Sequence, residues 1–132
     1  MKFIIVDDNT QFRNTLRLFI QENLKHSVIA EAESGEDFLK IEPIIIREAD
    51  IILMDIIMNR LNGFETTKQI TWMFPNLKII AVTMNVEQVF LNEVLEAGFK
   101  GCVFKSDIFD SLGKAIKEVS SGHIYVNKQL LS

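Results

Sequence analysis

The chain has 132 residues, of which 48% are hydrophobic and 24% charged, and this length and composition are typical of one globular domain and exclude a mainly disordered chain. A single cysteine and two histidines exclude a disulfide framework and a Cys/His-rich zinc site, and they fit a reducing compartment. The net charge of −4, the lack of a lysine- or arginine-rich block and the shortness of every apolar run indicate a cytoplasmic domain that binds neither nucleic acid nor a membrane.

Short aliphatic segments alternate along the chain with longer amphipathic ones. Residues 2–7 form a continuous apolar run that ends in aspartate, which is typical of a strand buried on both faces. Residues 12–24 carry apolar side chains at helical spacing. A weaker strand is predicted at 28–32, followed by a helix over 34–49 that Ser34 caps. We expect this helix to break or kink at Pro43, because proline removes a backbone donor.

The same alternation continues through the rest of the chain. Strands are predicted at 51–54, 78–82 and 101–104, and helices at 64–74, 86–97 and 108–119, with Gly98 and Gly122 at the ends of the last two helices. Alternating strands and helices with aliphatic strands predict an α/β domain whose parallel sheet is covered by helices on both faces. The last residues show neither pattern, and we expect an exit segment there rather than another element.

Aromatic residues at helical spacing are expected to pack in the core rather than to bind a cofactor. They are Phe12, Phe19, Phe64, Trp72 and Phe90. Phe38 and Phe109 are instead candidates for an exposed partner surface.

Polar side chains stand at the ends of four of the predicted strands. Asp7 and Asp8 follow the first strand, Asp55 the third, Thr83 the fourth and Lys105 the fifth. Each of them is by itself an ordinary turn or helix-capping residue. The carboxyl ends of parallel strands meet at one edge of the sheet, where such folds bind ligands, so their joint placement favours a functional site.

Three of these side chains are carboxylates, and crowded negative charges destabilise a fold unless they are compensated. Lys105 supplies one positive charge and a divalent cation supplies two, which together make the cluster neutral. A small set of hard oxygen ligands suits Mg²⁺, for which Mn²⁺ is expected to substitute. Because carboxylates form acyl phosphates, Asp55 in such a site can accept a phosphoryl group.

Five motifs span nearly the whole chain: Val6-Asp7-Asp8, Leu53-Met54-Asp55-Ile56, Leu61-Asn62-Gly63, Ala81-Val82-Thr83 and Phe104-Lys105. In this order and spacing, the sequence resembles the receiver domain of bacterial two-component response regulators. Residues 96–106, 115–116 and 122–125 further resemble receivers of the LuxR/NarL-type subfamily. The resemblance implies a flavodoxin-like (βα)5 fold over residues 1–120, with a doubly wound parallel five-stranded sheet in the order 2-1-3-4-5. Residues 121–132 resemble the start of an interdomain linker.

The resemblance also implies a role for each site residue. Asp55 would be the phosphoacceptor. Asp8 would bind Mg²⁺ directly and Asp7 mainly through water, with Asp55 and the backbone carbonyl of Ile57 as the remaining protein ligands. Lys105 would pair with the phosphoryl oxygens.

Thr83 would be the switch hydroxyl, drawn toward the phosphoryl group once that group has formed. The donor would be a sensor histidine kinase or a phosphotransfer protein that carries phosphohistidine. A homodimer is a further candidate assembly. Regulators of this subfamily usually carry a DNA-binding domain after the receiver, so transcription regulation is expected of a longer parent protein.

Four positions depart from the family pattern: Cys102, Ile57, and Asn59 and Ser106, where receivers usually have proline. The switch aromatic of strand five falls on Cys102, whose side chain cannot provide alternative ring positions. Free cysteine usually packs as a small hydrophobe, so we do not expect a redox role. Ile57 is apolar where the family side chain lies near the path of the hydrolytic water, which predicts an aspartyl-phosphate that lives longer than in an Ile57→Asn variant.

Three other functions were weighed against the receiver. An aspartyl-nucleophile phosphohydrolase of the haloacid-dehalogenase type needs a second aspartate at position 57, which holds isoleucine. A nucleotide- or flavin-binding module needs a glycine-rich loop after the first strand, and residues 7–10 contain no glycine. A receiver-like dimerisation scaffold that works without phosphorylation remains as the alternative, and the cysteine at position 102 is the feature that keeps it open.

Overall fold

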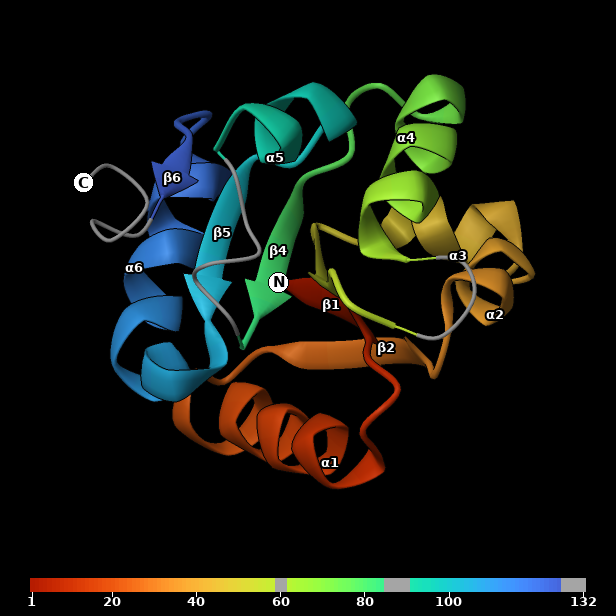
Figure 1. Ribbon diagram of the computed structural model, residues 1–132. Coiled ribbons are helices and arrows are strands. Elements are labelled where there is room, and N and C mark those ends of the chain that lie inside the picture. Colours follow the sequence, from red (N-terminus) through yellow and green to blue (C-terminus); the bar gives the residue numbers. More distant parts are fainter. Residues whose placement is uncertain (59–61, 85–90, 127–132) are drawn as a thin grey trace.

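A parallel sheet of six strands forms the centre of the protein in the computed structural model, which describes residues 1–58, 62–84 and 91–126 (Figure 1). The strands lie in the order β2-β1-β3-β4-β5-β6, and every neighbouring pair is parallel. They are β1 (Lys2–Val6), β2 (Ser27–Ala32), β3 (Ile51–Asp55), β4 (Ile79–Thr83), β5 (Gly101–Phe104) and β6 (Tyr125–Val126). The predicted α/β class and the order 2-1-3-4-5 of the first five strands are confirmed.

The short sixth strand lies in the segment that was predicted to hold no further element, and that prediction is wrong. Tyr125 and Val126 pair with Gly101 and Cys102 of β5, and the Tyr125 N–H donates to the carbonyl of Lys100 at 3.1 Å. A strand of two residues is too short to show a period of apolar and polar residues, so the sequence pattern could not reveal it.

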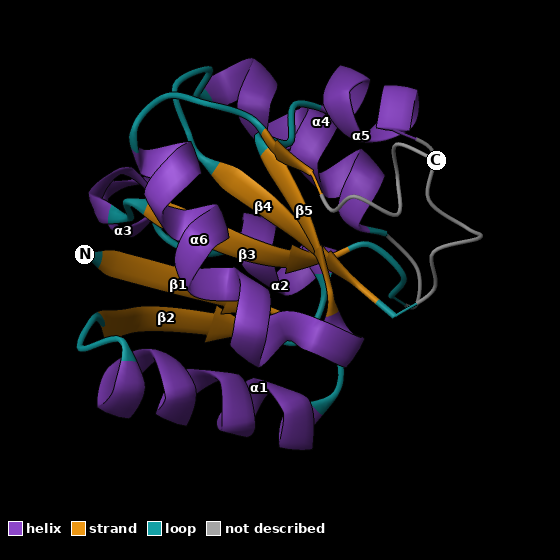
Figure 2. Cartoon of the chain, turned by 90° about the vertical axis from the view of Figure 1, so that its left-hand side faces the viewer, coloured by secondary structure: helices purple, strands orange, loops and turns teal. Residues whose placement is uncertain are grey.

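Helices cover both faces of the sheet. On one face lie α6 (Ile108–Ser120) and α1 (Thr10–Leu18), which continues as a π-helical turn over Phe19–Asn23 (Figure 2). On the other face lie α2 (Gly35–Leu39), α3 (Pro43–Glu48), α4 (Gly63–Met73) and α5 (Leu91–Ala97). A 3-10 turn, Lys105–Asp107, leads from β5 into α6. None of the helices in the described part of the chain is long and apolar enough to span a membrane.

The strands are buried on both sides because their apolar residues alternate between two hydrophobic clusters. Ile4, Ile52 and Ile79 point into the cluster beneath α2 to α5, whereas Phe3, Ile51 and Ile80 point into the cluster beneath α1 and α6. This alternation is the reason why the strands read as continuous aliphatic runs.

Local signals set several helix boundaries as predicted. Ser34 caps α2 by accepting the Asp37 N–H at 3.0 Å. The predicted helix over 34–49 is divided into α2 and α3, and Pro43 occupies the first turn of α3, where its missing N–H has no cost. Gly98 ends α5 with a φ of +108°, which favours glycine. The first residues of the predicted helix over 86–97 lie outside the described residues, as does Phe90.

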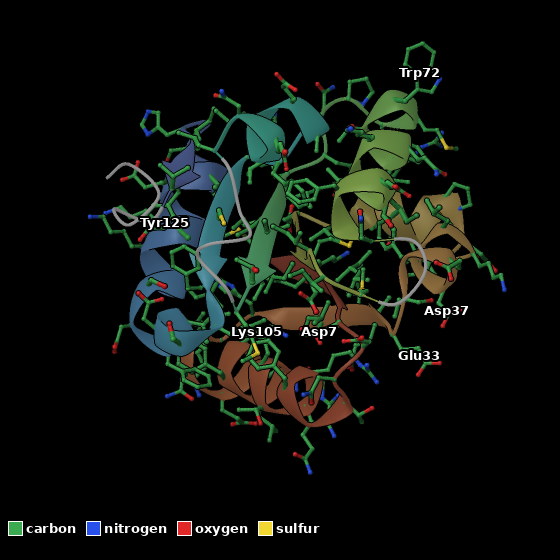
Figure 3. The ribbon with its side chains drawn as sticks, viewed as in Figure 1. Asp7, Glu33, Asp37, Trp72, Lys105 and Tyr125 are labelled. Atoms are coloured by element: carbon green, nitrogen blue, oxygen red, sulfur yellow. The ribbon has the colours of Figure 1, made fainter. Side chains whose placement is uncertain are left out.

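Two predictions for aromatic residues are wrong. Trp72, expected in the core, is 87% exposed near the end of α4 (Figure 3), and Phe38, a candidate for a partner surface, is fully buried. Phe109 is exposed as expected, and its ring packs edge-on against Phe19 at a centroid distance of 4.9 Å.

Candidate functional site

The carboxyl ends of β1, β3, β4 and β5 bring the predicted polar residues to one edge of the sheet. Asp7 directly follows β1, Asp55 and Thr83 are the last residues of β3 and β4, and Lys105 directly follows β5. Asp7 and Lys105 lie next to each other at this edge, above α1 (Figure 3). Four separate strands therefore build one site.

Three carboxylates form the acidic part of the site. Asp7, Asp8 and Asp55 each place one oxygen within 4.8 Å of the others. Asp7 and Asp55 are buried, with exposed fractions of 1% and 5%, whereas Asp8 is exposed. Several hard oxygen atoms that converge beside an open position fit Mg²⁺, which keeps part of its water shell when it binds to proteins. The donor set is thus of the kind that was predicted for this cation.

Lys105 supplies the positive charge that faces these carboxylates. Its Nζ lies 2.7 Å from Oδ2 of Asp7 and 3.5 Å from Oδ2 of Asp55. The lysine side chain is only 11% exposed, so water screens these ion pairs weakly. Among the described residues, Lys105 is the one that forms ion pairs with the buried carboxylates Asp7 and Asp55.

Burial and crowding change the acidity of Asp55. Burial is the largest cause and raises its pKa to about 7, and the neighbouring Asp7 carboxylate acts in the same direction. Lys105 and the backbone N–H of Ile57, which donates to Asp55 Oδ1 at 3.3 Å, oppose the rise, and Asp8 adds a smaller increase. Ionisation of Asp55 therefore raises the free energy of the folded protein unless a cation binds beside it.

Backbone and side-chain donors fix the loop that holds Asp7. The backbone N–H of Asn9 donates to Asp7 Oδ1 at 2.8 Å, and Arg13 of α1 donates to the Asp7 carbonyl. Arg13 also pairs with Glu31 of β2 at 3.3 Å, and Arg17 pairs with the same glutamate at 2.7 Å. Sequence reasoning missed this clamp, although the spacing of four between the two arginines places both on one face of a helix.

Gly63 lies against the end of β3, beside Asp55 and Ile56. Its backbone N–H donates to the carbonyl of Ile56 at 2.8 Å. A Cβ at this position would lie 2.2 Å from the Asp55 carbonyl oxygen, so only glycine lets α4 begin this close to β3. The Asn62-Gly63 motif is thereby explained, because Asn62 caps the same helix by accepting the Glu65 N–H.

Thr83 and Ile57 occupy the positions expected for them, but no contact of the structure assigns their roles. Thr83 is fully buried at the end of β4, and its Oγ1 has no hydrogen-bond partner among the described residues. Ile57 lies in the turn after β3 with its side chain 50% exposed, and its carbonyl remains a predicted ligand only. A buried hydroxyl without a partner is a group that can gain a bond when an acceptor forms nearby.

Cys102 is buried in the middle of β5 and points into the cluster beneath α2 to α5. Burial raises the pKa of its thiol to about 12, so the thiol stays protonated at neutral pH. The interpretation of Cys102 as a small core residue fits this environment.

The family comparison agrees with this geometry. The family model described as response regulator receiver domain matches residues 3–117. The chain belongs to the response regulator receiver domain family. Solved receiver domains have the same fold. One is the isolated receiver domain of RcsB from Salmonella enterica serovar Typhimurium in the presence of phosphomimetic BeF₃⁻. Its TM-score is 0.84 at 25% identity, and the match covers 99% of this chain and 96% of that one. A LuxR-family regulator from Aurantimonas sp. has a TM-score of 0.85 at 26% identity, over 98% of this chain and 91% of that one.

Curated relatives of this receiver domain are regulators of transcription by name. The chain is 35% identical over 131 residues to the transcriptional regulatory protein LnrK of Bacillus subtilis and 28% identical over 130 residues to the transcriptional regulatory protein DegU of Brevibacillus brevis. Each match covers 98% of this chain but only 58% and 54% of the two relatives. The predicted resemblance to the LuxR/NarL-type subfamily is confirmed, and the chain spans little more than half the length of these regulators.

Proposed function

We propose that this receiver domain takes a phosphoryl group onto Asp55 from the phosphohistidine of a sensor kinase or phosphotransfer protein. The observation that carries the proposal is the convergence of three carboxylates, with oxygens within 4.8 Å of one another, and of the Lys105 ammonium at one edge of the sheet. Family membership supports the same reading.

The transfer replaces one phosphorus bond by another. An oxygen of ionised Asp55 attacks the phosphorus and forms the O–P bond of an acyl phosphate, while the P–N bond of phosphohistidine breaks. The electron pair of that bond stays on the imidazole nitrogen, which then takes up a proton. Lys105, held beside Asp7 and Asp55, neutralises charge on the phosphoryl oxygens during the transfer.

Asp8, Asp55 and the carbonyl of Ile57 would hold Mg²⁺, with Asp7 acting through water, and Mn²⁺ would substitute. The cation supplies charge neutralisation when it is bound, and it favours the ionised form of Asp55 that the attack requires. Asp7 keeps its position through the bonds from Asn9 and Arg13.

Phosphorylation would change a surface through Thr83, whose buried hydroxyl has no partner among the described residues and gains an acceptor when Asp55 carries a phosphoryl group. The altered surface would regulate dimer formation or a C-terminal DNA-binding domain, to which residues 121–132 would lead. Solved RcsB proteins form dimers that bind DNA, which supports this assembly for a longer regulator.

The test is treatment of the protein with acetyl phosphate or beryllofluoride and Mg²⁺, followed by intact mass and by the oligomeric state in solution. We expect one phosphoryl group on the wild type and none on Asp55→Asn. The matched control is Asp110→Asn, which removes an exposed carboxylate from α6, outside the acidic cluster, and should be modified like the wild type. An unmodified wild type that is a stable dimer would favour the scaffold function, and repeated turnover of a phosphate ester would favour a phosphohydrolase.

A further inference from the structure

The aromatic ring of Phe12 contacts the lysine of the site. Lys105 Nζ lies over the ring at 4.4 Å from its centroid. The same ammonium faces Asp7 and Asp55, so two carboxylates and one aromatic face surround it. An ammonium has three N–H donors, and the negative face of an aromatic ring attracts it without demanding one direction.

The residue that binds Asp7 also caps the turn of α1 that carries Phe12. The Asn9 backbone N–H donates to Asp7 Oδ1 at 2.8 Å, and the Asn9 side chain accepts the Phe12 N–H at 3.0 Å. Lys105 Nζ lies 2.7 Å from Asp7 Oδ2 and over the Phe12 ring, so Asp7, Asn9, Phe12 and Lys105 each contact the next residue in a closed loop. The first turn of α1 therefore sets both the carboxylate and the ring that hold the ammonium.

The geometry points to Phe12 as a positioning residue for Lys105, an inference that rests on the proposed phosphoryl transfer. A lysine side chain has a flexible four-carbon stem, and its ammonium must leave Asp7 for the phosphoryl oxygens once Asp55 is modified. Cation–π attraction acts while the cation stays over the ring within about 6 Å of its centroid, so an ammonium at 4.4 Å can shift and still contact the ring. It also covers one side of the ammonium, which helps to explain why Lys105 is only 11% exposed.

Phe12 is only partly buried, which makes its substitution practicable. Phe12 and Lys105 both line an open hollow of about 330 Å³. Phe12→Leu removes the aromatic face but keeps an apolar side chain, and Phe12→Tyr keeps the face and can direct its hydroxyl into the hollow. Phe19→Leu is the matched control, because Phe19 lies on the same helical segment and its ring meets Phe109 instead of the lysine.

The experiment combines a spectrum of the lysine with a rate. In wild type we expect the ring current of Phe12 to shift the ε-methylene protons of Lys105 upfield in NMR spectra of lysine-labelled protein, because the ammonium lies 4.4 Å from the ring centroid. We expect this shift to vanish in Phe12→Leu and to persist in Phe12→Tyr and Phe19→Leu. Phosphorylation by acetyl phosphate should be slower in Phe12→Leu, by at most roughly thirtyfold, the full factor of a partly desolvated cation–π contact, and should recover in Phe12→Tyr.

Three outcomes would overturn the inference: a Lys105 spectrum unchanged in Phe12→Leu, a lost shift with an unchanged rate, or a slow rate that Phe12→Tyr does not restore. If the wild type itself takes up no phosphoryl group, the proposed function fails. The spectra then still decide whether Phe12 holds the ammonium, so the two failures are distinguishable.

Discussion

Replacing Asp55 with asparagine is expected to stabilise the protein when divalent cations are removed. The gain should appear at neutral and higher pH, where the carboxyl group would be ionised, and should vanish at acid pH. Asp55 is 5% exposed, and burial together with the nearby Asp7 carboxylate raises its pKa to about 7, against an ordinary value of 3.8. Asparagine has nearly the same shape and no charge. The variant therefore lacks the cost of holding a charge at this position.

The size and the sign of the effect follow from the pKa. The difference between 3.8 and about 7 corresponds to about 4 kcal/mol of unfolding free energy, at roughly 1.4 kcal/mol per pKa unit. The folded protein binds the Asp55 proton more tightly than the unfolded chain does. The contribution of this proton to the free energy of unfolding is therefore fully present below pH 3.8 and is lost as the pH rises through about 7. Asp55→Asn should exceed the wild type by about 4 kcal/mol near pH 8 and by less than about 1 kcal/mol near pH 4.

Urea unfolding in EDTA at several pH values, followed by circular dichroism, measures the difference. Fluorescence is the poorer probe, since Trp72 is already 87% exposed in the folded protein. Asp110→Asn, an exposed carboxylate outside the cluster, is the control and should stay close to the wild type at every pH. A gain for Asp55→Asn that is absent near pH 8, or equally large near pH 4, would refute the reasoning. Adding Mg²⁺ should narrow the gap, because a ligand of the native carboxylates stabilises the wild type.

Three further predictions concern the close contact at Gly63, the thiol of Cys102 and the proposed chemistry at Asp55. Gly63→Ala should destabilise the fold by about 1–3 kcal/mol, since its Cβ would lie 2.2 Å from the Asp55 carbonyl oxygen. Gly113→Ala in α6, with its nearest neighbour at 3.9 Å, should instead gain about 0.5–1 kcal/mol, and urea unfolding that ranks the two variants the other way would contradict this. Because burial raises the pKa of Cys102 to about 12, alkylation of the folded protein near pH 8 should be slow and should become fast in urea, and rapid labelling of native protein would show an accessible thiolate. If Asp55 is phosphorylated as proposed, Ile57→Asn should shorten the lifetime of the aspartyl-phosphate in Mg²⁺, and an equal or longer lifetime measured by mass would count against a role for this side chain.

The sheet and the site could be predicted because each strand ends where its apolar run ends. Asp7, Asp55, Thr83 and Lys105 mark the carboxyl ends of four parallel strands, and parallel pairing then places them at one edge without any further assumption. The sequence alone could not show that Lys105 lies closer to Asp7 than to Asp55, because that choice depends on rotamers and on the ring of a neighbouring helix.

Trp72 shows where the spacing argument fails. The buried stripe of α4 runs through Gly63, Thr66, Thr67 and Ile70, so two small polar residues occupy the face toward the sheet. Trp72 is two positions after Ile70, which turns it by about 200° around the helix axis and away from that stripe. An apolar residue does not define the buried face when threonines take the contact instead, and the Thr66 hydroxyl bonds to the Asn62 carbonyl of the preceding turn.

The contacts of the two buried carboxylates favour Asp55 over Asp7 as the nucleophile. The Asp7 oxygens have close partners, the Asn9 N–H at 2.8 Å and the Lys105 ammonium at 2.7 Å. Asp55 has only longer contacts, with the Ile57 N–H at 3.3 Å and with Lys105 at 3.5 Å. Asp7 is therefore held by the shorter contacts, and the looser hold on Asp55 fits its proposed role as the nucleophile. The high pKa of Asp55 has a separate cause: burial and the nearby Asp7 carboxylate disfavour its charged form, and the contacts from Lys105 and Ile57 oppose this effect only in part. The ionised form that the proposed attack requires therefore depends on further positive charge, which a bound divalent cation would supply.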